Sequence, residues 1–407
     1  MDTGTFSLKK LGEVLDLKNG KSIKPGGVGE YPVFGSNGII GGCHEHTEHS
    51  GIVIGRVGAY CGSVTFCPGK FWASDNTIVA HPKNKDYDVI FLAYLLKKLD
   101  LNRWAGGAAQ PLLTQTVLKQ IETAFPSLTI QCKIAAILSA YDDLIENNLR
   151  RIKILEEMAQ ALYREWFVHF RFPGHEKVRL VDSPLGKIPE GWEVSTLGDN
   201  ITALESGKRP KGGVANISEG IPSIGAENID GMGKHDFLSE KYVPESFFRS
   251  MKKGVVADGD VALYKDGAYI GRSTYYRDGF PYRECCVNEH VFLIRTDKQK
   301  ITPNMLYLWF RQPETIGLIR SKNANAAQPG INQKDVKDLG ITVPDMNIVQ
   351  MFDSLADPIL GEIILLAKKN NVLMHIRDLL LPKLITGEVD VSDLEIALPR
   401  GLKHESH

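Results

Sequence analysis

An internal duplication constrains the fold of this 407-residue chain more than any other feature of its sequence. The four residues AAQP occur at Ala108–Pro111 and again at Ala326–Pro329, 218 positions later. Beyond these loops the same offset continues without a break, so that Leu162 falls on Leu380. A repeat of about half the chain is too long for a solenoid unit. The pattern therefore predicts two homologous domains, each followed by the same kind of segment.

The first part of each repeat is rich in glycine and in short apolar runs. The runs GIVIGRV and NTIVAHP stand in the first copy, and GDVALY and HVFLIRT in the second. They are β-branched and bounded by Gly, Asp, Asn or Pro, which predicts short strands joined by turns. A helical stretch, YDVIFLAYLLKKL or PNMLYLWFRQ, precedes each AAQP loop. Each copy is therefore expected to be a mixed α/β domain.

The second part of each repeat is expected to be a long helix. Between Thr129 and Phe167 there is neither Gly nor Pro, and Ser127 or Thr129 can cap the start. Apolar residues recur at steps of four and three, as in a coiled-coil seam, and Asn148 is a polar residue of the kind that fixes register. The seam positions are Tyr141, Ile145, Asn148, Ile152, Leu155, Ala159, Leu162 and Trp166.

The second helix, Asn347 to Ile385, repeats this pattern. Its seam positions are Phe352, Leu355, Ile359, Ile363, Leu366, Leu373, Leu380 and Leu384. Pro358 falls inside it, so this helix is expected to kink or to start late. One amphipathic helix cannot bury its own apolar stripe, but two can bury theirs against each other. We expect an antiparallel pair that holds the globular domains apart; the alternative is two independent domains, each with its helix folded back.

The expected fold class is α+β (mixed), with two homologous domains, a coiled-coil spacer of two long antiparallel helices and an internal pseudo-two-fold. The expected organisation is a globular domain over residues 1–127, a long helix and central spacer over 128–172, a linker over 173–189, a second globular domain over 190–345, a second long helix over 346–390 and a tail over 391–407.

The composition of the chain limits the cellular environment and the class of binding partner that can be expected for it. A net charge of −1 provides no general attraction to nucleic acid or anionic membrane, although a local basic face can still exist. No apolar run approaches the roughly 20 residues of a membrane helix, and the N-terminus lacks the apolar region of a secretory signal. Six cysteines in so long a chain do not predict a disulfide framework. We expect a cytoplasmic protein.

Catalytic motifs are not found. Gly20–Ser22 reads GKS, but Leu15 stands where a phosphate loop needs glycine. Neither G-x-S-x-G nor H-E-x-x-H occurs. The loop GCHEHTEH, Gly42–His49, offers possible zinc ligands, but its spacing is not a recognised ligand pattern and the second repeat has no counterpart. An ordinary polar loop is the favoured interpretation, and no catalytic or metal-binding residue is assigned.

Two similar domains on a spacer suit a target with two similar sites at a fixed separation, and DNA offers equivalent groove faces about every 34 Å. Lys and Arg can bind phosphates, and Arg, Asn and Gln can pair with base edges. The candidates in the first repeat are Lys21, Lys24, Asn37, Arg56, Tyr60, Arg103 and Gln110. Those in the second are Lys208, Arg209, Lys211, Asn228, Lys265, Tyr269, Arg272, Lys322, Asn323, Asn325 and Gln328.

Three phrases carry a family resemblance. They are PSLTIQCKIAAILSAYDDLIENN (Pro126–Asn148), SPLGKIPEGWEVSTLGD (Ser183–Asp199) and LLLPKLITGEVDV (Leu379–Val391). With the duplication, they make the chain resemble the DNA-specificity subunit of type I restriction–modification systems. The resemblance implies that each globular part is a target-recognition domain reading one half of a bipartite, asymmetric sequence in double-stranded DNA. It also implies that the helices set the unread gap and that the subunit has no catalysis of its own.

The resemblance further implies partners and their cofactors. Two methyltransferase subunits would methylate adenine with S-adenosylmethionine, and restriction/translocase subunits would use ATP and Mg; this subunit would need no cofactor. Two other classes stay open from the residues alone. One is a non-catalytic protein-binding adaptor on a coiled coil, for which salt-independent behaviour is the discriminating observation. The other is a zinc-dependent hydrolase using the Cys43–His49 loop, which predicts stoichiometric bound zinc.

Overall fold

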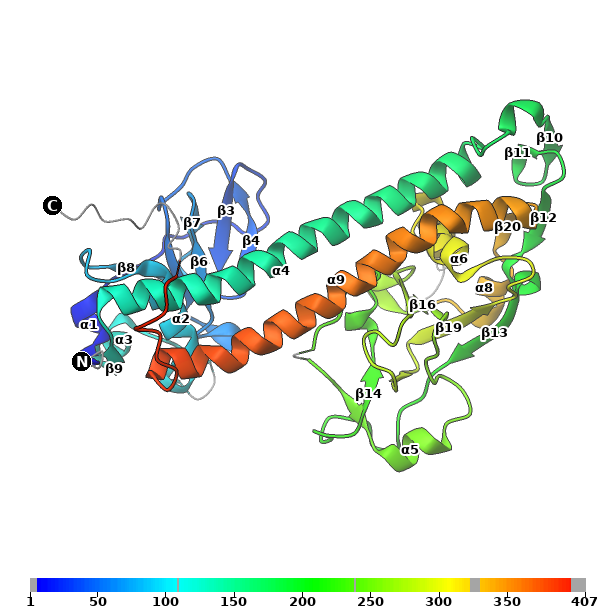
Figure 1. Ribbon diagram of the computed structural model, residues 1–407. Helices are drawn as coiled ribbons and strands as arrows, with labels where there is room; N and C mark the ends of the chain where they lie inside the picture. The colour runs from blue at the N-terminus through cyan, green and yellow to red at the C-terminus, as the bar shows by residue number, and fades with distance from the viewer. Residues whose placement is uncertain (1–5, 108–109, 238, 323–329, 397–407) are drawn as a thin grey trace. The chain divides into compact units, whose positions relative to one another are not determined.

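The fold consists of two compact units whose boundary cuts both long helices (Figure 1). The structure, a computed structural model, describes residues 6–107, 110–237, 239–322 and 330–396. The first unit comprises residues 1–145 and 373–407, and the second residues 146–372. Both units mix short strands with helices, so the predicted α/β character is confirmed.

The first unit is built on two small sheets. A four-stranded antiparallel sheet has the order β2 (Leu15–Asn19), β8 (Thr77–Pro82), β5 (Gly51–Gly55), β6 (Val64–Cys67). A second sheet has the order β4 (Gly38–Cys43), β3 (Tyr31–Gly35), β7 (Trp72–Ala73), with β3 and β7 parallel. Also present are β1 (Ser7–Lys10), α1 (Leu11–Val14), α2 (Val89–Lys98), α3 (Gln115–Gln120) and β9 (Glu122–Phe125), which pairs with β1. The runs GIVIGRV and NTIVAHP thus supply β5 and β8, as predicted.

The second unit repeats the strand order of both sheets of the first. Its four-stranded sheet has the order β13 (Ile201–Ser206), β19 (Val291–Thr296), β16 (Val261–Tyr264), β17 (Ser273–Tyr275). Its three-stranded sheet has the order β15 (Tyr242–Val243), β14 (Ile221–Ile224), β18 (Cys286–Val287), with β14 and β18 parallel. The remaining elements are β10 (Leu180–Ser183), β11 (Gly186–Pro189), β12 (Glu193–Thr196), α5 (Glu245–Ser250), α6 (Pro303–Phe310), α7 (Pro313–Ser321), α8 (Gln333–Lys337) and β20 (Gly340–Val343), which pairs with β12. The predicted duplication is therefore a duplication of fold.

A close contact between a glycine and a lysine is also repeated in the two units. A Cβ atom on Gly12 would lie 2.9 Å from Cβ of Lys119, and one on Gly198 would lie 3.1 Å from Cβ of Lys337. The two lysines are separated by the same 218 positions as the AAQP loops. Separations this short are tighter than ordinary van der Waals contact, so the approach of the two backbones favours glycine at both positions.

Both long helices are present. Helix α4 spans Leu128–Tyr163 and continues into a π-helical turn, Arg164–Val168; helix α9 spans Met346–Thr386. Within the second unit they run antiparallel, because Trp166 contacts Phe352 at a ring distance of 5.8 Å near one end while Asn148 and Asn370 meet near the other. The two predicted helices and their antiparallel direction are confirmed within this unit.

The predicted late start at Pro358 is wrong. Helix α9 begins at Met346 and passes through Pro358 without a break in the helical assignment. The neighbouring turns explain its tolerance, because Ala356 and Leu360 are fully buried in the core of the second unit. The Asp357 carboxylate also accepts hydrogen bonds from Arg277 and Asn304. Tertiary packing here outweighs the helix-breaking tendency of proline.

The structure separates the predicted seam residues by burial. Buried are Asn148, Ile152, Ala159, Trp166, Phe352, Ile363, Leu366 and Leu384; half-buried are Tyr141, Ile145, Leu155, Leu162, Ile359, Leu373 and Leu380. Leu355 is exposed, and the buried position in that turn is its neighbour Ala356. The π-helical turn after α4 places Trp166 and Phe167 together against Phe352. The seam of α9 therefore shifts by one residue from the heptad pattern at this end.

Asn148 Nδ2 donates a hydrogen bond of 2.8 Å to Asn370 Oδ1 inside the apolar seam. Replacing Asn148 by alanine removes this donor from a buried carbonyl oxygen, which costs about 1–3 kcal/mol of unfolding free energy. Urea unfolding of the full chain measures the loss, and exposed Asn147→Ala is the matched control. Equal stabilities of the two variants would contradict a structural role for the pair.

Two further observations bear on the sequence predictions. In the part of the chain that the structure describes, no helix is long and apolar enough to cross a membrane. The six cysteines all lie within the described residues and none is disulfide-bonded. Cys132, which lies on helix α4, is buried in the first unit.

Candidate nucleic-acid interface

Two backbone hydrogen bonds fix the loops of the first unit around the end of strand β5. Arg56, just after β5, donates its N–H to the carbonyl of Asn76 at 2.9 Å. The carbonyl of Arg56 accepts the N–H of Leu113 at 2.9 Å, two residues after Pro111 of the AAQP sequence. These bonds, here called the loop frame, tie three separate segments together beside the short 3-10 turn Gly58–Tyr60.

The second unit contains the same loop frame. Lys265, after β16, donates its N–H to the carbonyl of His290 at 3.1 Å and accepts the N–H of Ile331 at 3.0 Å. The matching 3-10 turn is Gly267–Tyr269. Leu113 and Ile331 are again 218 positions apart. Ala108 and Ala109 of the first AAQP sequence, and the whole of the second, lie outside the described residues. Leu113 and Ile331 each stand two residues after an AAQP sequence, and the backbone hydrogen bonds that hold them are the same in both units.

Ser36 strengthens the loop frame of the first unit. Its Oγ accepts the backbone N–H groups of Arg56 and Val57, both at 3.2 Å, and donates to the carbonyl of Asn76 at 2.7 Å. Ser63 Oγ donates to the Ser36 carbonyl at 2.6 Å. Sequence reasoning missed Ser36, since a single serine in a loop gives no signal. In the second unit, the equivalent residue is Ala226.

Most candidates of the first repeat lie around this frame. Lys21 is held beside it, because its N–H donates to the Ala73 carbonyl at 2.8 Å. Tyr60 is 61% exposed, and Arg56 is half-buried. Also exposed are Asn37, Arg103 and Gln110. Lys24 is exposed on a different loop, whose Gly26 N–H donates to the Ile40 carbonyl of β4. Asn37 follows Ser36, and Gln110 precedes Pro111, whose carbonyl accepts the N–H of Gly58, so these two candidates lie beside the frame with Lys21, Arg56 and Tyr60.

Three cationic candidates of the second unit, Arg209, Lys265 and Arg272, form ion pairs with carboxylates. Arg209 pairs with Glu289 at 3.1 Å, and Lys265 with Asp266 at 3.5 Å. Asp266 also contacts His290 Nδ1 at 2.7 Å. Sequence reasoning considered only cations and amides, and so missed these carboxylates. They lower the positive charge of the surface, and they also provide acceptors that an arginine-only surface lacks.

One candidate of the second repeat is corrected by the structure, and three others lie in a part of the chain that the structure does not describe. Asn228 is buried, and its Oδ1 accepts the backbone N–H of Asp236 at 2.7 Å. It is therefore not part of the exposed surface, because its side chain stabilises its own loop. Lys208, Lys211 and Lys322 are exposed. Asn323, Asn325 and Gln328 lie outside the described residues.

Glu227 occupies the position equivalent to Asn37, and its charge is balanced locally. Lys241 Nζ lies 2.6 Å from the Glu227 carboxylate. Burial acts to raise the pKa of the Glu227 carboxyl, but the hydrogen bond and charge of Lys241 outweigh burial and hold the pKa below its ordinary value. The group is consequently ionised at neutral pH. The two units thus offer different chemistry, an amide and a carboxylate, on equivalent positions.

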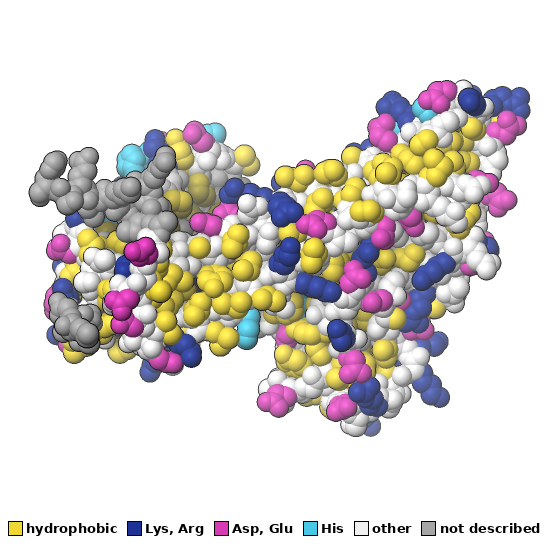
Figure 2. All heavy atoms as spheres, in the orientation of Figure 1, with side chains coloured by type: hydrophobic (Ala, Val, Ile, Leu, Met, Phe, Trp, Pro, Cys, Tyr) yellow, Lys and Arg dark blue, Asp and Glu magenta, His cyan; other side chains and the backbone are white. Residues whose placement is uncertain are grey.

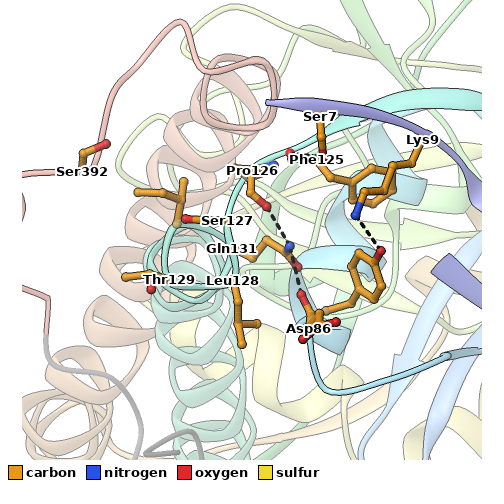
Figure 3. A pocket seen from close by; sticks show the side chains of 12 residues that line it. Ser7, Lys9, Asp86, Phe125, Pro126, Ser127, Leu128, Thr129, Gln131 and Ser392 are labelled. Carbon is orange, nitrogen blue, oxygen red and sulfur yellow. Dashed lines mark hydrogen bonds between the residues drawn. The ribbon is translucent and has the colours of Figure 1, made fainter. Parts of the chain in front are cut away.

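A cavity of about 550 Å³ lies away from the loop frame, at the start of α4 (Figure 3). Several of its polar side chains already have partners: Lys9 Nζ donates to Tyr87 Oη at 3.0 Å, and Gln131 Nε2 donates to the Pro126 carbonyl at 3.0 Å. Gln131 also accepts the N–H of Asp88, which caps α2. These bonds fasten α4 to its domain, so a structural role accounts for them.

The histidine-rich loop shows ring packing. His46 packs against Tyr31 and His49 at ring distances of 5.1 and 4.7 Å. Within the described ranges, no group of three or more His, Cys, Asp or Glu side chains is arranged to hold a metal ion. The zinc hypothesis therefore gains no support from this geometry.

Each of the two α/β domains contains its own copy of the loop frame. The chain therefore presents two surfaces built in the same way. The family described as "Type I restriction modification DNA specificity domain" matches residues 4–157 and 189–373. These two matches cover more than half of the chain and follow its duplication. The chain belongs to this family.

Named relatives agree. The MjaIX type I restriction enzyme specificity subunit of Methanocaldococcus jannaschii is 30% identical over 311 residues, covering 75% of this chain and 70% of that protein. The EcoprrI specificity subunit of Escherichia coli is 34% identical over 145 residues, covering 33% of this chain and 36% of that protein. The solved S subunit of a type I restriction–modification system from M. genitalium has a TM-score of 0.57 at 17% identity, covering 94% of this chain and 97% of that one, which shows a common fold.

Proposed function

We propose that this specificity subunit reads a bipartite, asymmetric sequence in double-stranded DNA, one half with each unit. The observation that carries the proposal is the loop frame, built by the same two backbone hydrogen bonds in both units. Each frame is surrounded by exposed Lys, Arg, Asn, Gln or Tyr side chains, which suit phosphates and base edges. The surrounding side chains differ between the units, which supports two different half-sites.

The long helices would set the unread gap between the half-sites. They continue through the boundary between the units, and their apolar seam is closed by the buried Asn148–Asn370 pair. A continuous helix is a stiff connection, because every internal backbone group is hydrogen-bonded. The sequence expectation of a spacer is thus retained as part of the proposal.

The subunit itself would be non-catalytic and would recruit two methyltransferase subunits and the restriction/translocase subunits. Exposed apolar side chains on the helices of the second unit support this, and Figure 2 shows hydrophobic side chains along α4. Leu149, Ile154, Met158, Leu365 and Val372 are each between 46% and 57% exposed. Exposed apolar patches mark interaction surfaces. S-adenosylmethionine, ATP and Mg would be bound by the partners.

A methylome tests the proposal. The full chain is co-expressed with the methyltransferase gene adjacent to its own, and the host DNA is sequenced for methylated adenine. The expected result is a bipartite motif with a fixed unread gap, absent from cells that carry the methyltransferase alone. An active, soluble methyltransferase complex without such a motif would contradict the proposal and favour the adaptor alternative.

DNA binding also predicts a steep dependence on salt. Each phosphate contact releases counterions, so log K should fall with log salt at about −0.9 per contact, and Lys208→Ala should reduce that slope by about 1. Titrations of duplex DNA with the purified complex at several salt concentrations measure it. The control is Lys252→Ala, an equally exposed lysine outside the candidate loops. An adaptor that binds only protein would leave DNA affinity weak and unaffected by either variant.

A further inference from the structure

Arg272 follows the 3-10 turn of the second loop frame, and its guanidinium group is held against an aromatic ring. Its guanidinium carbon lies 4.1 Å from the ring centroid of Tyr269, within the 3-10 turn that the duplication kept. A guanidinium stacks well on an aromatic face and so keeps its N–H fork in a fixed plane. The Arg272 side chain is 36% exposed, so this plane is open to a ligand.

A carboxylate on a fixed loop completes the arrangement. Asp230 Oδ1 lies 3.7 Å from Arg272 Nη1, and among the described residues it is the one carboxylate within ion-pair distance of this arginine. The next residue, Gly231, donates to the Ser273 carbonyl at 3.0 Å and accepts from Thr274 Oγ1 at 2.8 Å. Both bonds go to β17, which follows Arg272 directly. The arginine and its carboxylate thus share one rigid support.

The first unit lacks this device at the same position. Tyr60 corresponds to Tyr269, and Ser63 corresponds to Arg272 in the aligned turns GAYCGS and GAYIGR. Ser63 is instead used internally, donating to the Ser36 carbonyl. At this position, therefore, the ring-stacked arginine of the second unit is replaced by serine in the first. A feature present in one copy of a duplicated surface suits the part of the target in which the two half-sites differ.

Resting on the proposed function, we propose that Arg272 reads a guanine in the half-site of the second unit, with Tyr269 and Asp230 as positioning residues. A planar fork held in place matches the O6 and N7 acceptors of guanine in the major groove. A long 3.7 Å contact with Asp230 leaves the remaining N–H groups to the base. The competing role, a phosphate contact, needs charge but no fixed plane.

Arg272→Ala and Arg272→Lys separate these roles. Competition binding uses the purified complex of the full chain with its methyltransferase and duplexes that carry each of the four base pairs at every position of the wild-type motif. A wild-type preference for guanine of roughly 5- to 150-fold at one position should fall to about 2-fold or less in Arg272→Ala and to an intermediate value in Arg272→Lys, which keeps a donor but loses the planar fork. Every other position, including the whole first half-site, should stay unchanged. Tyr269→Leu should weaken the same preference without changing the charge.

The lysine variant keeps the result decisive. Lysine retains the charge but lacks the fork, so a phosphate contact predicts that Arg272→Lys keeps the wild-type preferences while Arg272→Ala weakens all duplexes uniformly; that outcome would overturn the inference. Arg283→Ala, an exposed arginine outside the loop frame, is the matched control and should bind as the wild type does. If the wild-type complex prefers no bipartite motif, the proposed function itself fails; a normal wild-type motif with unchanged variants refutes Arg272 alone.

Discussion

Replacing Glu156 by alanine is expected to lower the unfolding free energy by about 3 kcal/mol, since it leaves the half-buried Arg311 without its counter-charge. Glu156 is 7% exposed on α4, and its Oε1 lies 2.9 Å from Arg311 Nη2. It also accepts the hydroxyl of Tyr307 at 3.2 Å. Burial raises the pKa of Tyr307, so this hydroxyl stays protonated and continues to donate. Among the described residues, Arg311 Nε has no hydrogen-bond partner, and Glu156 is the carboxylate within ion-pair distance of this arginine.

Urea unfolding followed by tryptophan fluorescence measures this loss. The signal reports mainly on the second unit, which holds Trp166, Trp192 and Trp309, three of the five tryptophans. Glu157→Ala is the matched control, because that neighbouring carboxylate is 65% exposed and its ion pair is on the surface. Glu156→Gln keeps an acceptor for Tyr307 and should fall between the two. Equal stabilities of Glu156→Ala and Glu157→Ala would show that α4 is not anchored here.

The fold could be predicted to the extent that it depends on repetition and periodicity. The unbroken offset of 218 gave the two domains, and steps of three and four gave both helices to within a few residues of their ends. Pro358 and Leu355 were mispredicted for one physical reason: local packing in the second unit decides what the helix tolerates and which face it buries. Heptad counting contains no information about the Phe352 cluster that shifts the seam there.

The candidate interface was predicted less completely. The loops that occur in both repeats indicated Arg56 and Lys265, whose backbone groups form the loop frame. The side-chain chemistry could not follow from residue types, because pairing depends on distant segments: Asp266 meets His290, and Asn228 turns inward to Asp236. Asp230, held by contacts to β17, similarly gives no signal in the sequence. A list of exposed-looking cations therefore omits the carboxylates that pair with them.

Shortening both long helices by one matched heptad is expected to shorten the unread gap and leave both half-sites unchanged. The deletion removes residues 143–149 from α4 and 369–375 from α9, so that both partners of the Asn148–Asn370 pair leave together and no buried amide loses its partner. Seven residues correspond to about 10 Å of helix, which is close to three base pairs at about 3.4 Å each.

The methylome of cells carrying this variant and the methyltransferase measures the gap directly. Shortening α4 alone is the informative comparison, because it moves Ile152 and Trp166 out of register with Ile363 and Phe352 and should reduce stability and methylation without producing a new fixed gap. The ion pairs Arg377–Asp142 and Arg151–Glu362 flank the double deletion and remain available to align the helices. An unchanged gap in the double deletion would show that the helices do not set the spacing. Altered half-sites with an unchanged gap would place sequence reading, instead of spacing, in the helices.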